Sequence, residues 1–155
     1  MRLAWAIVVA FITPLILEEP AMSTDGLITV RSSFGAQETM SRLEAEVRAK
    51  GMTVFAHIDH SAGAAAVGLP LRLTDLLVFG AAKGGTPLMQ AAQTIGIDLP
   101  LKALVWEDET GSTFLSYNDP SFLTRRHGID GSTQPAIDAM SGALKAIVAN
   151  ATAAP

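Results

Sequence analysis

The chain contains no cysteine. This absence excludes disulfides, thiolate nucleophiles, iron–sulfur ligation and thiolate zinc sites together. Charged residues are also scarce, at 17% of the sequence, and no segment concentrates Lys and Arg. The electrostatic footprint of a nucleic-acid-binding protein is therefore missing. There is also no Walker loop, dinucleotide fingerprint or nucleophile elbow, so the common nucleotide-binding and hydrolase classes have no support in the sequence.

Apolar residues are abundant, at 49% of 155 residues, and part of the excess lies at the N-terminus. Arg2 precedes an apolar run over residues 3–17, and the small-residue pattern Ala21-Met22-Ser23 follows. This order is typical of a secretory signal peptide, and the run is short of the roughly twenty residues that span a bilayer. We therefore predict a leader at 1–23 and a periplasmic or secreted protein. A cytoplasmic protein that starts at Met22, and an uncleaved membrane anchor, remain alternatives.

The rest of the chain has no internal repeat or low-complexity linker. We predict one domain over residues 24–150, followed by a disordered tail at 151–155. Period-two and helical spacings of apolar residues alternate along it in the order β-α-β-β-α-β-β-α. Hairpin-type connections predominate, so we expect an α+β fold with an antiparallel sheet and helices packed mainly on one face. The predicted strands cover residues 27–31, 52–60, 71–79, 101–106 and 113–117, and the main helices follow residues 35, 86 and 133.

Two local patterns determine where polar groups should point. In the strand at 52–60, Val54, Ala56 and Ile58 alternate with the residues between them. Strict alternation places Phe55, His57 and Asp59 on the face opposite the helix layer. Farther on, Lys83-Gly84-Gly85 predicts a turn, with Thr86 as the cap of the next helix and Pro87 at its first position.

The densest cluster of candidate ligand groups is His57, Asp59 and His60. A metal ion needs three or four such groups that converge, and imidazole with carboxylate would suit zinc or iron. The simpler interpretation is that Asp59 caps the turn that follows the strand and that a histidine hydrogen-bonds beside it. We therefore predict no metal. His127, remote in sequence, completes a site or ends a helix as a cation.

Four other residues are candidates for a binding site. Asp98 is either a base or ligand anchor, or a turn residue that bonds its own backbone. Lys83 and Thr86 place a cation and a hydroxyl at a helix start, where they cap the helix or hold an anion. We predict that His57 or His60, Asp98 and Tyr117 converge on one pocket with an apolar floor, and that Lys83 and Thr86 lie at its rim.

Five short motifs in order resemble the domain of unknown function 302 family over about residues 28 to 128. The resemblance implies an α+β fold and a homodimer, and it implies no established activity. The usual Asn-Pro is replaced by Ala81-Ala82, which should make the neighbouring pocket more apolar, and Gln93 stands where Pro is frequent. The motifs are Phe55-Ala-His-Ile-Asp-His60, Leu76-Leu-Val-Phe-Gly80, Gly85-Thr-Pro-Leu-Met89, Ile97-Asp-Leu-Pro-Leu-Lys102 with Val105-Trp-Glu-Asp108, and Tyr117-Asn-Asp-Pro120.

Two classes of function fit these observations. The first is a non-catalytic homodimeric module that binds a small molecule or a partner protein. The second is an enzyme, hydrolase- or redox-associated, that uses a His/Asp/Tyr cleft with or without a metal. The run Leu76–Phe79 is apolar on both faces and so needs cover on both, which favours a second subunit. The sequence identifies no cofactor and no ligand, and membrane contact is expected only if the leader is retained.

Overall fold

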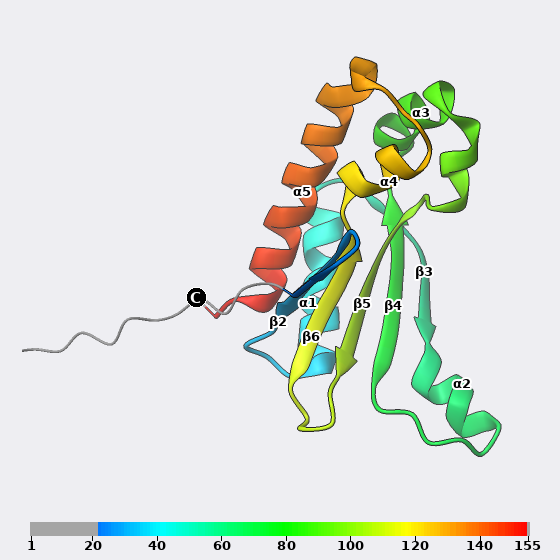
Figure 1. The fold of residues 1–155 in the computed structure, drawn as a ribbon. Helices are drawn as coiled ribbons and strands as arrows, with labels where there is room; N and C mark the ends of the chain where they lie inside the picture. Colours follow the sequence, from blue (N-terminus) through cyan, green and yellow to red (C-terminus); the bar gives the residue numbers. More distant parts are fainter. Residues whose placement is uncertain (1–21, 155) are drawn as a thin grey trace, which may run out of the picture.

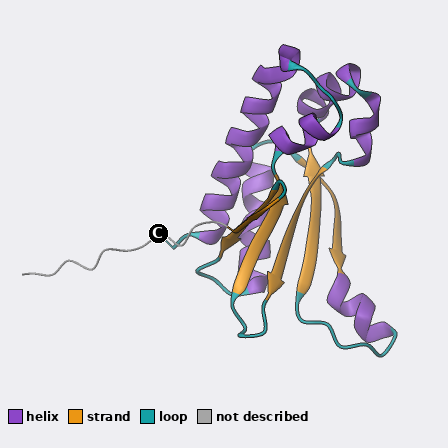
Figure 2. Cartoon of the chain, in the orientation of Figure 1, coloured by secondary structure: helices purple, strands orange, loops and turns teal. Residues whose placement is uncertain are grey.

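The computed structural model describes residues 22–154, which form a six-stranded antiparallel sheet with helices on one face and at one end (Figures 1 and 2). The strand order is β1-β2-β6-β5-β4-β3, so the predicted α+β architecture is confirmed. The elements are β1 (Met22–Thr24), β2 (Leu27–Arg31), α1 (Ala36–Ala49), β3 (Thr53–Asp59), α2 (His60–Ala66), β4 (Thr74–Gly80), α3 (Ala82–Ala91), η1 (Gln93–Ile97), β5 (Leu101–Glu107), β6 (Thr113–Asn118), α4 (Pro120–Arg126), η2 (Gly131–Thr133) and α5 (Gln134–Thr152).

The main core lies between the sheet and the layer formed by α1 and α5. The helix predicted after residue 35 packs one side against the sheet, with Leu43 and Val47 fully buried. Leu77, Ala103 and Leu115 meet it from β4, β5 and β6. Burying each Leu or Val side chain contributes about 1.5 to 3 kcal/mol before chain entropy is counted. This layer determines which face of every strand is inside.

The last helix is longer than predicted. Its buried stripe continues past Ile147 to Ala151 and Thr152, so the expected disordered tail is wrong for these two residues. The Thr152 carbonyl accepts a hydrogen bond from the Ser33 N–H, which ties the helix end to the loop before α1. The predicted leader lies outside the described residues except for Met22 and Ser23, which belong to β1.

A β-bulge interrupts the alternation predicted for β3. Val54 pairs with Phe79 and Ala56 pairs with Val78, so Phe55 is an extra residue without a partner on β4. Beyond the bulge the faces are exchanged. His57 pairs with the core residue Leu77, and it therefore lies on the helix side of the sheet, contrary to the prediction.

The third helix begins earlier than predicted. Ala81 is its N-cap, and the Gly84 and Gly85 N–H groups both donate to the Ala81 carbonyl. The expected Lys-Gly-Gly turn is therefore the first part of α3, and Pro87 lies inside the helix instead of at its start. Local propensity fails here because packing against α5 and η1 holds this segment in place.

A second, smaller core fixes α3, η1 and α4 against the start of α5. It consists of Leu88, Ile95, Leu123 and Ile137. These elements gather at the end of the sheet where β4 finishes and β5 begins, whereas α2 extends from the opposite end (Figure 1). The fold therefore has two different ends, and the candidate residues are divided between them.

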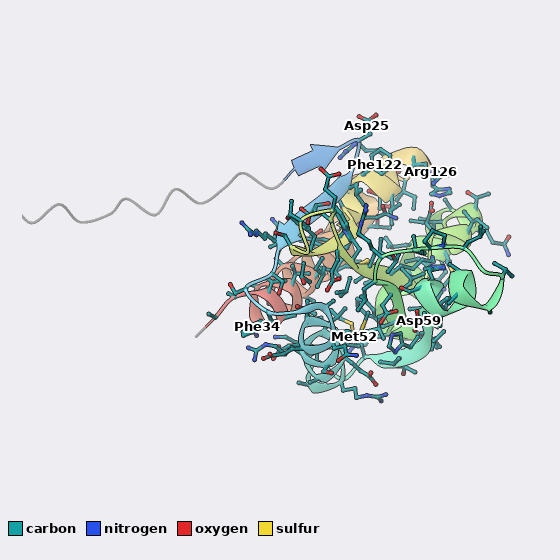
Figure 3. All side chains as sticks on the ribbon, turned by 90° about the horizontal axis from the view of Figure 1, so that it is seen from below. Asp25, Phe34, Met52, Asp59, Phe122 and Arg126 are labelled. Atoms are coloured by element: carbon teal, nitrogen blue, oxygen red, sulfur yellow. The ribbon has the colours of Figure 1, made fainter. Side chains whose placement is uncertain are left out.

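The β1–β2 turn contacts α4 closely, and Figure 3 shows Asp25 and Phe122 on this side of the molecule. Gly26 has φ +84°, and a Cβ there would lie 2.1 Å from Cγ of Phe122. The Gly26 carbonyl also accepts a hydrogen bond from the Asp119 N–H at 2.7 Å. Only glycine fits this position, both because of its backbone conformation and because of the ring against it.

Candidate functional site

A well-formed pocket lies between α3, α5 and the adjacent end of the sheet. Its volume is about 600 Å³, within the range of small-molecule sites. We call it the α3–α5 pocket. Its walls are mostly apolar and come from Met52, Phe55, Gly80, Ala81, Ala82, Lys83, Gly84, Gly85, Thr86, Met89, Leu99, Pro100, Leu101, Ala136, Ala139, Met140 and Ala143.

The bulge in β3 supplies one wall of this pocket. Phe55, the unpaired residue of the bulge, remains 58% exposed although it is a large apolar side chain. Its ring comes within 3.9 Å of where a Cβ on Gly80 would lie. β-Bulges commonly redirect a side chain beside a functional site. Here the bulge leaves Phe55 without a partner on β4, and the side chain lines the pocket.

Three methionines and a set of small residues form the rest of the cavity surface. A Cβ on Gly84 would lie 3.9 Å from the Met140 methyl, and one on Gly85 would lie 3.8 Å from the Met89 methyl. Met52 completes the set from the start of β3. Methionine side chains are flexible and polarizable, so this lining can adapt to ligands of different shape.

Two residues predicted for a site rim do line the pocket. Lys83 and Thr86 both belong to α3 and both contribute to its surface. Among residues 22–154, no carboxylate lies within 4.0 Å of the Lys83 ammonium. Lys83 is also the only charged residue in the lining. The pocket therefore combines an apolar interior with one cation.

Asp98 lies next to this pocket. The simpler interpretation predicted that its side chain bonds its own backbone, but the side chain bonds residues at the end of α4 instead. Its Oδ2 is 2.6 Å from Nε2 of His127, and its Oδ1 accepts from Arg126 at 3.2 Å. The other ring nitrogen of His127, Nδ1, is 3.0 Å from the Thr94 hydroxyl. These contacts fasten the loop before β5 to the end of α4. They also fix Leu99, which is a pocket wall.

The residues of the predicted His/Asp cluster lie at the other end of the sheet. Asp59 is the N-cap of α2 and accepts from the Ala62 N–H at 2.7 Å, as the simpler interpretation predicts. His57 is 3.3 Å from Asp75. His60 begins α2, and β3 separates it from Thr53 at the pocket end by roughly 23 Å, since a strand rises about 3.3 Å per residue. Among residues 22–154, no group of three or more His, Asp and Glu side chains could hold a metal ion.

Tyr117 belongs to neither end. It pairs with Ala103, which pairs with Leu77, and it is buried in the main core. Burial and then the charge of Asp119 raise the pKa of its phenol above the ordinary 10.0. The predicted convergence of His57 or His60 with Asp98 and Tyr117 is therefore wrong. The bulge, the length of β3 and the core position of Tyr117 keep the three apart.

Sequence reasoning missed most of the pocket lining. Phe55 was assigned to a regular strand because a bulge leaves no mark in a pattern of alternating residues. The three alanines of α5 carried a usable signal: Ala136, Ala139 and Ala143 recur at helical spacing beside Met140. Such a stripe of small side chains leaves room beside the helix.

The fold and the pocket define a class of small α+β domain with an apolar cavity at one end of an antiparallel sheet. Residues 28–147 match the family described as Domain of unknown function DUF302, and the chain belongs to this family. A solved structure of an uncharacterized conserved DUF302 protein from Bacillus stearothermophilus has the same fold, with a TM-score of 0.74 at 20% identity, over 83% of this chain and 99% of that one.

Curated relatives are considerably longer proteins. The chain is 47% identical over 115 residues to proteins named fluoride-specific ion channel FluC 1 from Brucella suis biovar 1 (strain 1330) and Brucella abortus biovar 1 (strain 9-941). The match covers 74% of this chain but only 45% and 43% of those proteins, so the chain spans less than half their length. Within residues 22–154, none of the helices has the length and apolar character needed to cross a membrane.

Proposed function

We propose that this domain is a non-catalytic module that binds a small, mostly apolar molecule in the α3–α5 pocket. The observation that carries the proposal is a cavity of about 600 Å³ whose walls include large apolar side chains left exposed to water. Phe55 is 58% exposed and Met89 is 36% exposed. A bound ligand would cover both, and burying apolar surface contributes about 25 cal/mol per Å².

The polar groups near the pocket support binding more than catalysis. An enzyme site brings titratable groups within hydrogen-bond reach inside a concave pocket. In the described chain, the close pair of Asp98 and His127 lies outside the pocket lining. Both carboxylate oxygens of Asp98 are already engaged, by His127 and Arg126. This arrangement suits a structural role for Asp98. Lys83 and Thr86 supply the few polar anchors that a binding pocket needs.

The proposal is tested by native mass spectrometry of the full chain purified from its own host. We expect a retained small molecule, and we expect Ala139→Trp to lose it because the indole would occupy the pocket from the α5 side. Ala149→Trp, on the same helix but outside the lining, is the matched control and should keep the ligand. Equal ligand content in both variants, or none in the wild type after gentle purification, would contradict the proposal.

We further propose that the domain is a homodimer whose subunits cover each other's open sheet face. The face opposite α1 and α5 carries apolar side chains on β3, β4, β5 and β6, with Trp106 stacked on Phe114 at 4.9 Å. No described helix of the same chain packs over its centre, and apolar patches of this kind mark interaction sites. Its members include Ala56, Ile58, Leu76, Val78, Leu104, Trp106 and Phe114.

Sedimentation tests the dimer directly. Leu104→Asp places a charge in the middle of the open face and should yield monomers at tens of micromolar. Ala45→Asp changes the net charge equally but lies on the exposed side of α1, so it should remain dimeric. A wild-type monomer at these concentrations would overturn this part of the proposal.

Export is a separate proposal that rests on the sequence alone, because residues 1–21 lie outside the described part of the chain. N-terminal sequencing of the protein from its host should return a start at or near Thr24. Intact Met1 in a membrane fraction would indicate an anchor, and a first residue at Met22 in the cytoplasm would contradict both.

A further inference from the structure

We infer that the ligand of the α3–α5 pocket is an amphipathic anion: an apolar body that carries one carboxylate held by Lys83. This inference rests on the proposed binding function and adds the chemical class of the ligand. It follows from the charge of the pocket lining, the size of the cavity, and the hydrogen bonds and ion pair that neighbouring basic residues already make.

The pocket lining carries charge of one sign. The lining contains Lys83 and no acidic residue. Within residues 22–154, no carboxylate comes within ion-pair distance of its ammonium group. A cationic ligand would meet repulsion from Lys83 with no carboxylate to offset it, and a neutral ligand would gain nothing from it. A carboxylate is the group that would form a charge-assisted hydrogen bond there.

Two other basic groups near this end of the sheet are already engaged. Lys102 donates from Nζ to the carbonyls of Asp98 and Pro100, at 3.0 and 3.1 Å. Arg126 pairs with the Asp98 carboxylate. Lys83 is the one charged residue of the pocket lining, and no carboxylate of residues 22–154 pairs with it, so it is the lining residue that can select an anion.

The cavity size limits the ligand. A volume of about 600 Å³ is roughly twenty times the 30 Å³ that a water molecule occupies in the liquid. A ligand of roughly ten to twenty non-hydrogen atoms therefore fits, with its apolar part against Phe55 and the methionines. Aliphatic or aromatic monocarboxylates of this size are the expected class.

Calorimetric titration with a matched pair of probes, octanoate and 1-octanol, tests the inference on the full chain. We expect the wild type to bind octanoate roughly tenfold more tightly, the size of effect that one charge-assisted contact supplies. Lys83→Met should bind the two probes with equal affinity. Lys145→Met removes the same charge from an exposed position on α5 outside the lining, and it should keep the preference for octanoate.

The outcomes distinguish failure of the anion inference from failure of the proposed binding function. If 1-octanol and octanoate bind the wild type equally, or if Lys83→Met keeps the preference, the anion inference is overturned while the apolar pocket stands. If neither probe binds the wild type, both the inference and the proposed binding function are overturned. If Ala139→Trp still binds octanoate as the wild type does, the anion site lies elsewhere and the inference is also overturned.

Discussion

The two ends of the sheet each carry a histidine beside an aspartate, but the two pairs differ in contact distance, in the exposure of the histidine and in the hydrogen bonding of the aspartate. His127 is 2.6 Å from Asp98, and the two side chains are only 9% and 13% exposed. His57 is 3.3 Å from Asp75, and its side chain is 43% exposed. Both oxygens of Asp98 have partners, whereas Asp75 Oδ1 is buried without a hydrogen-bond partner.

This difference shows that residue type and spacing do not identify a site. The sequence drew attention to the histidine cluster at the α2 end because its members are close in the chain. The closer and better-satisfied pair joins residues 29 positions apart, and it supports the end with the pocket.

The largest effect is expected for Gly26→Ala, at the contact between the β1–β2 turn and α4. The new methyl would clash with the Phe122 ring, and the positive φ adds strain, so we expect a loss of about 3 kcal/mol in the free energy of unfolding. Gly111→Ala has a similar φ of +79° and open space around it, and it should lose only about 1 kcal/mol. Urea denaturation measures both, and equal losses would show that α4 does not hold the turn.

The two histidines provide the direct comparison. His127→Ala leaves a mostly buried carboxylate with fewer partners and should cost about 2 kcal/mol. His57→Ala breaks the longer contact of a half-exposed ring with Asp75 and should cost less, about 1 kcal/mol. Chemical denaturation of the two variants under identical conditions measures both losses in the free energy of unfolding. A larger loss for His57→Ala than for His127→Ala would contradict the structural role given to the Asp98–His127 pair.

Phe55→Ala should separate ligand binding from stability. Because the ring is 58% exposed, its removal should change the free energy of unfolding by about 0.5 kcal/mol or less. It should nevertheless weaken binding of 1-octanol, since the ring is a pocket wall. Leu43→Ala, in the main core, provides the contrast with an expected loss of about 2 to 5 kcal/mol. A Phe55→Ala loss in that range would mean that the ring is a core residue.

The smallest effect concerns Tyr117 and is visible only in alkali. Burial and the nearby Asp119 raise the pKa of its phenol above 10.0, so the folded state favours the neutral form. Its contribution to stability is present below pH 10 and is lost as the pH rises through the folded pKa. The chain has a single tyrosine, so ultraviolet absorbance of the phenolate reports this group alone. A midpoint at or below 10 would contradict its placement in the core, and Asp119→Asn should lower the midpoint.

Much of the fold was predictable from sequence, because helix stripes and β-branched runs report burial directly. The helix after residue 35 and the strands predicted over 27–31, 101–106 and 113–117 all occur where the pattern predicts them, to within one residue. The start of α3 was missed because Lys83-Gly84-Gly85 has turn propensity, and only contacts distant in sequence hold it as a helix.

The candidate site was predictable only in part. Lys83 and Thr86 do line the pocket, although they come from the body of a helix and not from its cap. The single extra residue at Phe55 reverses every later face of β3, and no local signal marks it. The pairing of Asp98 with His127 depends on how α4 returns to the sheet. Such long-range geometry is not encoded in the spacing of nearby residues.

The most direct test of the account uses the methionine methyl groups as probes. Met52, Met89 and Met140 line the pocket, whereas Met40 is buried between the helices and the sheet. In nuclear magnetic resonance spectra of methyl-labelled protein, titration with octanoate should shift the signals of the three pocket methionines and leave that of Met40 in place. Shifts that spare Met89 and Met140, or that appear first at Met40, would contradict the claim that this pocket binds the ligand.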